Sequence, residues 1–190
     1  MDQKKIREGV KLILEGIGED PKRPGILNTP ARVARMYEEV FSGIGHSAEE
    51  VVTVLKSTGY DEIVLVRDIP FTSYCEHHMV PFIGKAHVAY LPNGGRITGP
   101  SKLARAVEVE SRKLQLQERL TTAIAEAICK RLRPKGVLVI LEAEHLCMTM
   151  RGIKKPGSKT ITSVVRGIFR DNPATRAEAM MLIYGRASST

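Results

Sequence analysis

The sequence predicts an α+β fold, with N-terminal helices and an antiparallel four-stranded sheet that carries two helices on one face. The first observation is a set of β-rich runs, at residues 61–69, 84–92, 136–148 and 160–169. The second is a pair of helical patterns, about 101–114 and 118–132, between the second and third runs. Because consecutive elements tend to pack as neighbours, this order predicts one sheet with a helical layer.

Two amphipathic helices are expected at the start of the chain. In the first, apolar residues recur at helical spacing, at Ile6, Val10, Ile13 and Ile17. The second begins at Thr29, a residue type that caps helices, and has Pro30 in its first turn. The segment between them, residues 18–28, is rich in Gly and Pro, and such a loop would let the first helix reach a neighbouring subunit.

The chain divides into two expected parts. We expect an N-terminal helical region over residues 1–58 and the main domain over residues 59–190. Within the main domain, "NGG" at 93–95 predicts a turn after the second strand. A terminal helix is expected from about Thr175.

Composition narrows the class of protein. With 190 residues, 43% of them hydrophobic and 26% charged, the chain resembles ordinary soluble proteins. Charges interrupt every apolar run of the N-terminus, which argues against a signal peptide or a membrane span and predicts a cytoplasmic protein. Three widely spaced cysteines argue against a disulfide framework. The net charge of +8 predicts an anionic ligand, either nucleic acid or a polyphosphate.

Cysteine and histidine spacing predicts a metal site. Cys75 and His78 stand three residues apart before the second strand, and Cys147 stands at the expected end of the third. Such a Cys2His set binds zinc and leaves a fourth tetrahedral position for water, as in catalytic sites. Two other readings stay open at this point. One is a closed structural zinc with His77 or His145 as fourth ligand, and the other is no metal.

In the catalytic reading, His77 and His145 are additional imidazoles beside the metal, and imidazole transfers protons near neutral pH. If His145 and Cys147 lie on a regular strand, their side chains point to the same side. His87 has no companion and is predicted to be structural, while Cys129 is predicted to be a small buried side chain in a helix.

A phosphate site is predicted at the start of the first central helix. Ser101 is a plausible N-cap, and Lys102 and Arg105 share a face of the first turn. Free N–H groups, the helix dipole and two cations suit a polyphosphate. A capped helix with solvated basic residues explains the same pattern equally well. Arg151 follows Cys147 closely and brings further positive charge toward the metal site.

Gln117 and Glu118 stand at the junction of the two central helices. A carboxylate at a helix start is ordinarily favourable dipole chemistry. It is also the natural acceptor for the N1–H and amino group of guanine. Together with the metal, the imidazoles and the cations, this pair predicts hydrolysis of a purine nucleotide.

A family resemblance rests on five motifs in order: "CEHHMVPFIGKAHVAYLPN", "GPSKLARAVE", "LQLQERLT", "EAEHLCMTMRG" and "KPGSKTITSVVRGIF". The chain resembles the GTP cyclohydrolase I family from about Pro70 to Asn172, and "TPARVARMY" extends the likeness toward the N-terminus. The resemblance implies a zinc enzyme with a tunnelling fold. It implies conversion of GTP and water to 7,8-dihydroneopterin triphosphate and formate, the first step of tetrahydrofolate biosynthesis.

The resemblance also implies an assembly. Sheets from several subunits would join edge to edge into a barrel, and two stacked pentamers would form a homo-decamer with active sites between subunits. Residue roles follow by matching position to position. The resemblance implies Cys75, His78 and Cys147 as Zn²⁺ ligands, His77, His145 and Ser101 as catalytic residues, and Gln117, Glu118, Lys102, Arg105, Arg151 and, less clearly, Arg32 as substrate-binding residues.

Two rival classes make different demands on the sequence. A zinc nucleobase deaminase would share the metal and the substrate type, but its H-x-E and P-C-x-x-C signature is absent from the sequence. A zinc-stabilised nucleic-acid module would need an aromatic or basic binding surface, yet the chain has no tryptophan, five tyrosines and four phenylalanines. We therefore expect a nucleotide substrate, and neither a nucleic acid nor a membrane as partner.

Overall fold

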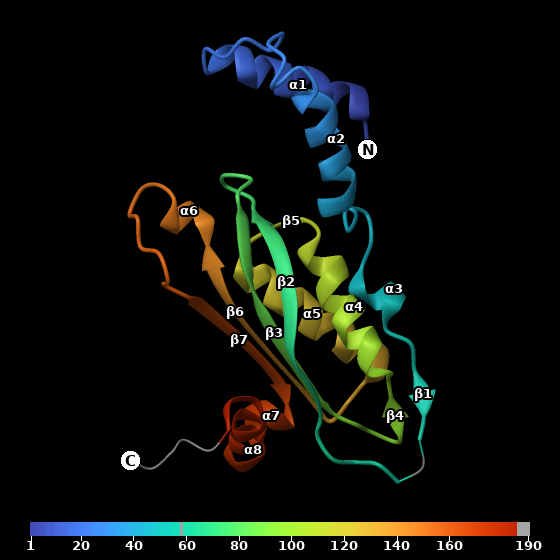
Figure 1. The fold of residues 1–190 in the computed structure, drawn as a ribbon. Coiled ribbons are helices and arrows are strands. Elements are labelled where there is room, and N and C mark those ends of the chain that lie inside the picture. The colour runs from blue at the N-terminus through green and yellow to red at the C-terminus, as the bar shows by residue number, and fades with distance from the viewer. Residues whose placement is uncertain (58, 186–190) are drawn as a thin grey trace. The chain divides into compact units, whose positions relative to one another are not determined.

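A computed structural model describes residues 1–57 and 59–185 of the chain (Figure 1). It contains two compact units, Met1–Ser42 and Gly43–Thr190. Residues 43–57, which fall within the expected N-terminal region, belong to the second unit.

The first unit is a pair of helices, α1 (Gln3–Gly16) and α2 (Thr29–Val40). The Asp2 carboxylate accepts a hydrogen bond from Lys5 N at 3.0 Å and so caps α1. The predicted cap at Thr29 is wrong, because Thr29 is already helical and Asn28 is the N-cap residue, with no side-chain bond. Pro30 occupies the first turn as expected, where its missing N–H costs nothing.

The second unit contains the sheet. Its elements are α3 (Ala48–Val51), β1 (Leu55–Lys56), β2 (Val64–Cys75), β3 (Pro81–Leu91), β4 (Arg96–Ile97), α4 (Pro100–Ser111), β5 (Leu114–Gln115), α5 (Gln117–Leu132), β6 (Gly136–His145), α6 (Leu146–Thr149), β7 (Thr160–Gly167), α7 (Ile168–Asp171) and α8 (Pro173–Tyr184). The predicted order of strand pair, helix pair and strand pair is confirmed.

The main sheet has five strands in the order β5-β2-β3-β6-β7. The four long strands are antiparallel, as predicted. The prediction missed β5, which pairs with β2 in parallel through Tyr74↔Leu114 and Cys75↔Gln115. Two residues between two helices carry too little pattern to be recognised as a strand. The sheet is therefore mixed, and β5 places the start of α5 beside the end of β2.

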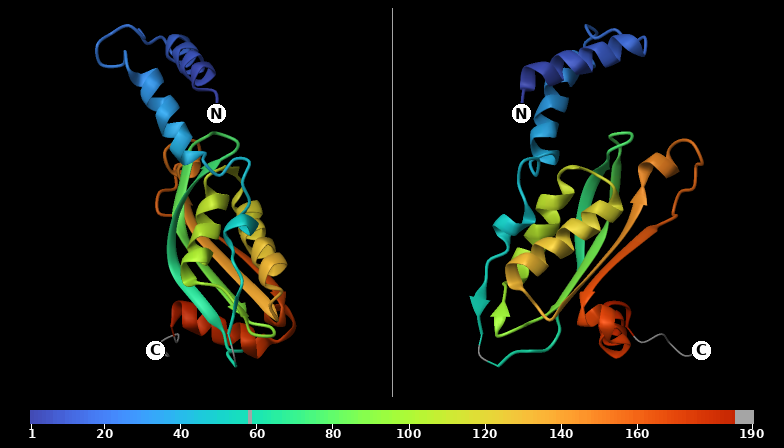
Figure 2. Two further views of the ribbon diagram at one scale, coloured as in Figure 1. Left: turned by 90° about the vertical axis from the view of Figure 1, so that its right-hand side faces the viewer. Right: turned by 180° about the vertical axis from the view of Figure 1, so that it is seen from behind.

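Helices α4 and α5 cover one face of the sheet (Figure 2). The core between them contains Val88, Val139 and Leu141 from the sheet and Leu103 and Ile124 from the helices. Alternate residues of β3 and β6 point to the opposite face, since side chains alternate along a strand.

On that opposite face, Ala89, Leu138 and Ile140 pack with Phe169 of α7 and Ile183 of α8. The terminal helix thus covers part of the second face rather than adding to the helical layer (Figure 1).

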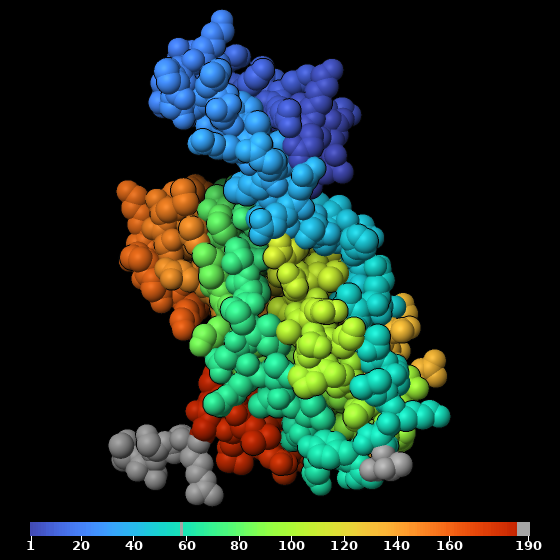
Figure 3. Space-filling view, turned by 45° about the vertical axis from the view of Figure 1, so that its right-hand side comes forward, coloured from blue at the N-terminus to red at the C-terminus, as the bar shows by residue number. Residues whose placement is uncertain are grey.

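Residues 43–57 lie against the helical layer. Ala48 N donates to the buried carboxylate of Glu110 at 2.8 Å, and Lys113 Nζ reaches the same carboxylate at 2.7 Å. Arg131 of α5 donates to Val52 O at 3.2 Å. Figure 3 shows the cyan atoms of this segment beside the yellow-green atoms of α4.

His87 is a structural histidine, as predicted. It lies on β3 and is 2% exposed, and its Nδ1 accepts from Asp68 N at 3.2 Å. Its Nε2 therefore carries hydrogen and donates to Glu142 of β6 at 3.2 Å. Asp68 has a φ of 58° inside the bulge where the β2–β3 register shifts. The ring thus fastens the bulge to the neighbouring strand.

Candidate active site

Cys75, His78 and Cys147 come together at one end of the sheet, with one ligand atom from each lying within 4.8 Å of the others. We call this end, formed by the last residues of β2 and β6, by β5 and by the start of α5, the metal end. Cys75 Sγ lies 4.0 Å from His78 Nδ1. Two sulfur atoms and one imidazole nitrogen are the donor set of a zinc site with an open position, so these residues fit that metal.

The β2–β3 turn brings the first two ligands together. Cys75 is the last residue of β2, and Met79 N donates to its carbonyl oxygen at 2.8 Å. Cys75 N donates in turn to Val80 O at 2.9 Å, which closes the turn. Met79 has a φ of 54°, the left-handed conformation that tight turns use. Three residues of turn thus place His78 close to Cys75.

Cys147 reaches the site differently from the prediction. β6 ends at His145, and residues 146–149 form the short helix α6, so the expectation that His145 and Cys147 share one side of a regular strand is wrong. The helical turn redirects the chain, and Cys147 still comes within reach of Cys75. Burial raises the pKa of the Cys147 thiol above its usual value, and the neighbouring Cys75 thiol raises it further.

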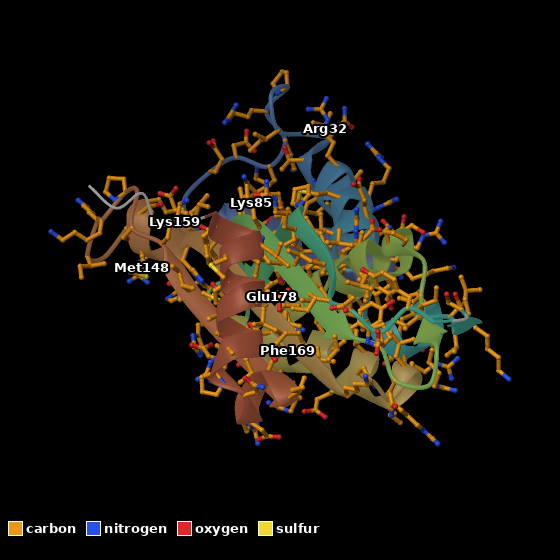
Figure 4. The ribbon with its side chains drawn as sticks, turned by 90° about the horizontal axis from the view of Figure 1, so that it is seen from below. Arg32, Lys85, Met148, Lys159, Phe169 and Glu178 are labelled. Atoms are coloured by element: carbon orange, nitrogen blue, oxygen red, sulfur yellow. The ribbon has the colours of Figure 1, made fainter. Side chains whose placement is uncertain are left out.

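Arg151 lies directly beside the metal ligands. Its Nη1 donates to His78 Nε2 at 2.7 Å, which leaves Nδ1 as the ring nitrogen that faces Cys75. The segment that carries Arg151 folds back on itself, with Lys155 N donating to Met148 O at 3.0 Å. Met148 and Lys159, labelled in Figure 4, mark the two ends of this basic loop.

The two predicted catalytic histidines have different surroundings. His77 is exposed, and its ring centroid lies 6.2 Å from that of His78 in a T-shaped arrangement. His145 is half-buried, and its ring stacks on Phe82 with a centroid distance of 4.5 Å and an interplanar angle of 4°. Burial lowers the pKa of His145, although the nearby Glu118 carboxylate opposes that shift.

Gln117 and Glu118 begin α5 at the metal end. Glu118 is exposed, so its carboxylate is accessible to a ligand. Gln117 is 1% exposed, and its amide lies inside the protein with its oxygen 2.8 Å from His145 Nε2. The pair predicted to read a base is thus adjacent to His145, with one side chain facing outward and the other inward.

Arg119, which was not predicted as a site residue, joins the β2–β3 turn to α5. Arg119 donates to Glu76, to Gln115 Oε1 at 3.0 Å and to Leu114 O at 3.2 Å. Glu76 N donates to Gln115 O at 3.1 Å. One feature of the sequence pointed to this contact: Glu76 is an acidic residue between the two ligands Cys75 and His78, and no partner was assigned to it. Its partner depends on β5, which the sequence did not reveal.

Ser101, Lys102 and Arg105 lie away from the metal end. They belong to the first half of α4, whose N-cap is Gly99 and not Ser101, so the predicted cap is wrong. Pro100 already fits the first helical position, which moves the boundary back.

The last residues of α4 lead directly into β5 beside Cys75. At 1.5 Å per residue, the start of α4 is therefore about 15 Å farther along the helix axis. Thr98 N, just before α4, donates to Tyr90 Oη at 3.0 Å, and Tyr90 pairs with Val64 and Val137, where β2 and β6 begin. The metal end and the start of α4, which carries the residues predicted to bind phosphate, thus lie toward opposite ends of the sheet (Figure 1). Arg32 is exposed on α2, in the first unit.

Comparisons with known proteins agree on one family. The family model described as GTP cyclohydrolase I matches residues 6–184. A relative from Pelotomaculum thermopropionicum, "GTP cyclohydrolase 1", is 61% identical over 98% of this chain and 99% of the relative. Another of the same name, from Halalkalibacterium halodurans, is 56% identical over 97% of this chain and 98% of the relative.

Among solved structures, that of the archaeosine synthase QueF-Like in the apo form is similar with a TM-score of 0.44 and 14% identity, over 58% of this chain and 97% of that chain. In the part of the chain that the structure describes, every helix is too short or too polar to cross a membrane. Because the family model spans nearly the whole sequence and the relatives align almost end to end, this chain belongs to the GTP cyclohydrolase I family.

Proposed function

We propose that this protein catalyses the hydrolytic opening of the guanine imidazole ring of GTP, giving 7,8-dihydroneopterin triphosphate and formate. The observation that carries the proposal is the Cys75, His78 and Cys147 group with His145 and Glu118 beside it at the metal end. A metal, a proton carrier and a carboxylate at one place match what ring hydrolysis of a guanine requires.

Zinc would be held by Cys75 Sγ, Cys147 Sγ and one imidazole nitrogen of His78. When bound, it supplies a Lewis acid that makes a water molecule acidic enough to react near neutral pH. The protein must keep both thiols reduced for this, which is why we place the reaction in the cytoplasm. The third ligand leaves one tetrahedral position for water, which favours a catalytic site over a closed structural one.

His145 and His77 carry the proton transfers. Water adds at C8 while a proton reaches N7. Cleavage of the C8–N9 bond then turns the C8 hydroxyl into a formyl group and delivers a proton to N9, and later steps move protons on the ribose. His145, stacked on Phe82, is the more rigid of the two, while exposed His77 is free to reorient. Glu118 accepts the N1–H and the amino group of guanine, and this orients C8 toward the metal.

The triphosphate is bound by groups from more than one chain. Since Ser101 and Lys102 lie about 15 Å along α4 from its end at the metal end, and Arg105 about 9 Å, a second copy supplies these residues to each site. Arg151 adds a cation from the chain that holds the metal. We also assign a phosphate contact to Arg32, whether it comes from the same or another copy. These contacts position the reacting ring from a distance.

Edge strands support the homo-oligomer. β7 ends the main sheet, and Ile161 on it is 62% exposed. When another sheet pairs with an edge strand, the backbone groups of that strand form hydrogen bonds and its apolar side chains are covered. We therefore propose that sheets of neighbouring copies join into the barrel of a tunnelling fold and that two pentameric rings stack into a decamer.

The test is to incubate the zinc-loaded protein with GTP and to assay formate together with a pterin that fluoresces after oxidation. Both products are expected in equal amounts. Release of ammonia instead would indicate a deaminase. Absence of turnover, combined with unfolding when zinc is chelated, would make the zinc structural and overturn the proposal.

A further inference from the structure

The buried side chain of Gln117 is the most completely hydrogen-bonded group at the metal end. It is the first residue of α5 and is 1% exposed. Its amide nitrogen lies 3.1 Å from Leu141 O, 3.0 Å from Thr160 O and 3.1 Å from Thr162 Oγ1. Its amide oxygen lies 2.8 Å from His145 Nε2. One side chain thus connects α5, β6 and β7 to the histidine.

These neighbours fix which end of the amide faces His145. An amide can in principle be turned over, exchanging its oxygen and nitrogen. Leu141 O and Thr160 O are backbone carbonyl oxygens, which can only accept hydrogen bonds. Turning the amide over would place its oxygen against both carbonyl oxygens. Two buried acceptors would then have no hydrogen-bond donor, which is destabilising. The NH2 group therefore faces the strands, and the carbonyl oxygen faces the ring.

The surrounding hydroxyl groups reinforce this orientation. Thr121 Oγ1 donates to the backbone oxygen of Gln117 at 2.6 Å, so its hydrogen is already used. Thr162 Oγ1, 2.7 Å away, then donates to Thr121 and offers its lone pair to the amide nitrogen of Gln117. The network closes on itself between α5 and β7.

The orientation of the amide determines the hydrogen on His145. Since Gln117 Oε1 can only accept, His145 Nε2 must carry hydrogen, and the lone pair of the neutral ring is at Nδ1. The stacked ring of Phe82 restricts rotation of the imidazole about this contact. The contact persists whether or not Nδ1 holds a proton, because Nε2 donates in both cases.

We propose that Gln117 is a positioning residue that holds the ring of His145 in place and in the Nε2–H tautomer. The inference rests on the proposed function. It means that the Gln117 side chain does not contact the guanine base, since such a contact would have to break the internal hydrogen-bond network. Guanine recognition then belongs to the exposed carboxylate of Glu118.

The direct test substitutes Gln117→Met, which keeps the length of the side chain and removes both polar ends. The expected result is a fall in kcat of about 10- to 100-fold with little change in KM for GTP, as for other lost orienting partners. A rise in KM with kcat preserved would overturn the proposal and return Gln117 to base recognition.

Thr162→Val is the second variant. It removes the hydroxyl group that accepts from the amide nitrogen of Gln117, and it leaves the contact between Gln117 and His145 in place. A smaller fall in kcat, again with KM unchanged, is expected. If Gln117→Met does not fold, Thr162→Val alone tests the proposal. A wild-type kcat in Thr162→Val would contradict the claim that this hydrogen-bond network positions His145.

A double-mutant comparison separates positioning from binding. In a His145→Ala background, Gln117→Met should leave both the residual kcat and the dissociation constant for GTP unchanged, because its only route to the chemistry is gone. A further loss of about tenfold or more in GTP affinity would overturn the proposal.

One readout does not depend on turnover. In protein labelled with ¹⁵N-histidine, the His145 signals of the wild type should show hydrogen on Nε2, and those of Gln117→Met should show a mixture of tautomers. Wild-type signals of the Nδ1–H form would refute the positioning role even in a fully active enzyme. Failure of GTP turnover with the expected tautomer would instead refute only the proposed reaction.

Discussion

Neighbouring residues at the metal end have unlike surroundings, and these assign them unlike tasks. His145 is stacked on Phe82 and held by Gln117, whereas Cys147, two positions later, points toward Cys75 from a helical turn. Arg151 contacts the far nitrogen of His78. If Nδ1 of His78 bound a metal, Nε2 would carry hydrogen, and the Arg151 guanidinium, which can only donate, would have to move away from it.

We predict opposite outcomes for two substitutions in this short segment. His145→Ala should retain zinc and lose about 10²- to 10⁴-fold in kcat, because it removes a proton carrier. Cys147→Ser should lose zinc and activity together, because it removes a soft ligand. Zinc content by elemental analysis, measured beside formate release, distinguishes the two. Loss of zinc from His145→Ala would show that the ligands are wrongly assigned.

The His87–Glu142 contact predicts a pH dependence of stability. His87 and then Lys159 lower the pKa of Glu142. A lowered carboxyl pKa stabilises the fold above the unfolded value of about 4.3, and this contribution is lost as pH falls through the folded pKa. Glu142→Gln should therefore cost about 1 kcal/mol at pH 6, and the cost should shrink toward pH 3.

Urea unfolding at both pH values measures this difference. Glu178→Gln, which makes the same charge change at an exposed position on α8 (labelled in Figure 4), is the matched control. A cost of Glu142→Gln that grows as the pH falls would contradict the assignment.

Residue identities in the site were more predictable than their contacts. The spacing of Cys75 and His78 indicates a chelating pair because a tight turn can bring such neighbours together. The distant Cys147 was recognised as a ligand by its type. The inward amide of Gln117 was not foreseen, because a side chain at a helix start turns in or out according to the strands behind it, and sequence alone does not describe those strands.

Short connecting elements set the geometry at the scale of helices and strands. β5 brings Leu114 and Gln115 beside the end of β2, and α6 turns the chain after β6. Both escaped prediction because two to four residues hold no measurable periodicity. The long strands and helices were predictable, since each repeats its pattern over many residues and buries one face of it.

The Glu76–Arg119 contact connects the β2–β3 turn to α5, and Arg119 also donates hydrogen bonds to Gln115 and Leu114. We predict that Glu76→Gln weakens zinc binding about 10- to 100-fold, because the turn between Cys75 and His78 loses its anchor. Competition with a chelating dye measures the affinity.

Glu126→Gln is the matched control for this prediction. It breaks a pair with Arg166 at 2.8 Å, nine residues beyond Gln117 on the same helix. Equal zinc affinities for Glu76→Gln and Glu126→Gln would show that Glu76 does not support the site.

At the scale of the whole molecule, the residues that the proposed function brings into one site lie at two ends of the same sheet. The proposed function assigns the chemistry to the metal end and the phosphate contacts to the start of α4, about 15 Å apart along one chain. The sequence could predict both groups but not their separation, since residues 75 and 101 are near in number. The separation becomes visible only from the direction in which α4 runs along the sheet.

Two inactive variants should therefore restore each other. Cys147→Ser lacks the metal and Lys102→Ala lacks a phosphate cation, so each alone should be nearly inactive. Co-expressed in equal amounts, they should recover about a quarter of wild-type activity, because random mixing places both intact halves at that share of the shared sites.

Mixing the two purified proteins without subunit exchange is the control and should give no recovery. If co-expression also gives none while the variants demonstrably assemble together, each site is complete within one chain and the proposed sharing is wrong.

The open edge at β7 has a consequence for the life of a single chain. Until a neighbouring sheet of the proposed assembly covers Thr160–Gly167, that strand presents the edge of the main sheet and an exposed isoleucine to any other extended segment. The proposed assembly would depend on mass action, so a newly made chain at low concentration would remain longest in this exposed state. The edge of a chain that is made slowly would therefore stay accessible to other proteins longest, until enough copies have accumulated to assemble.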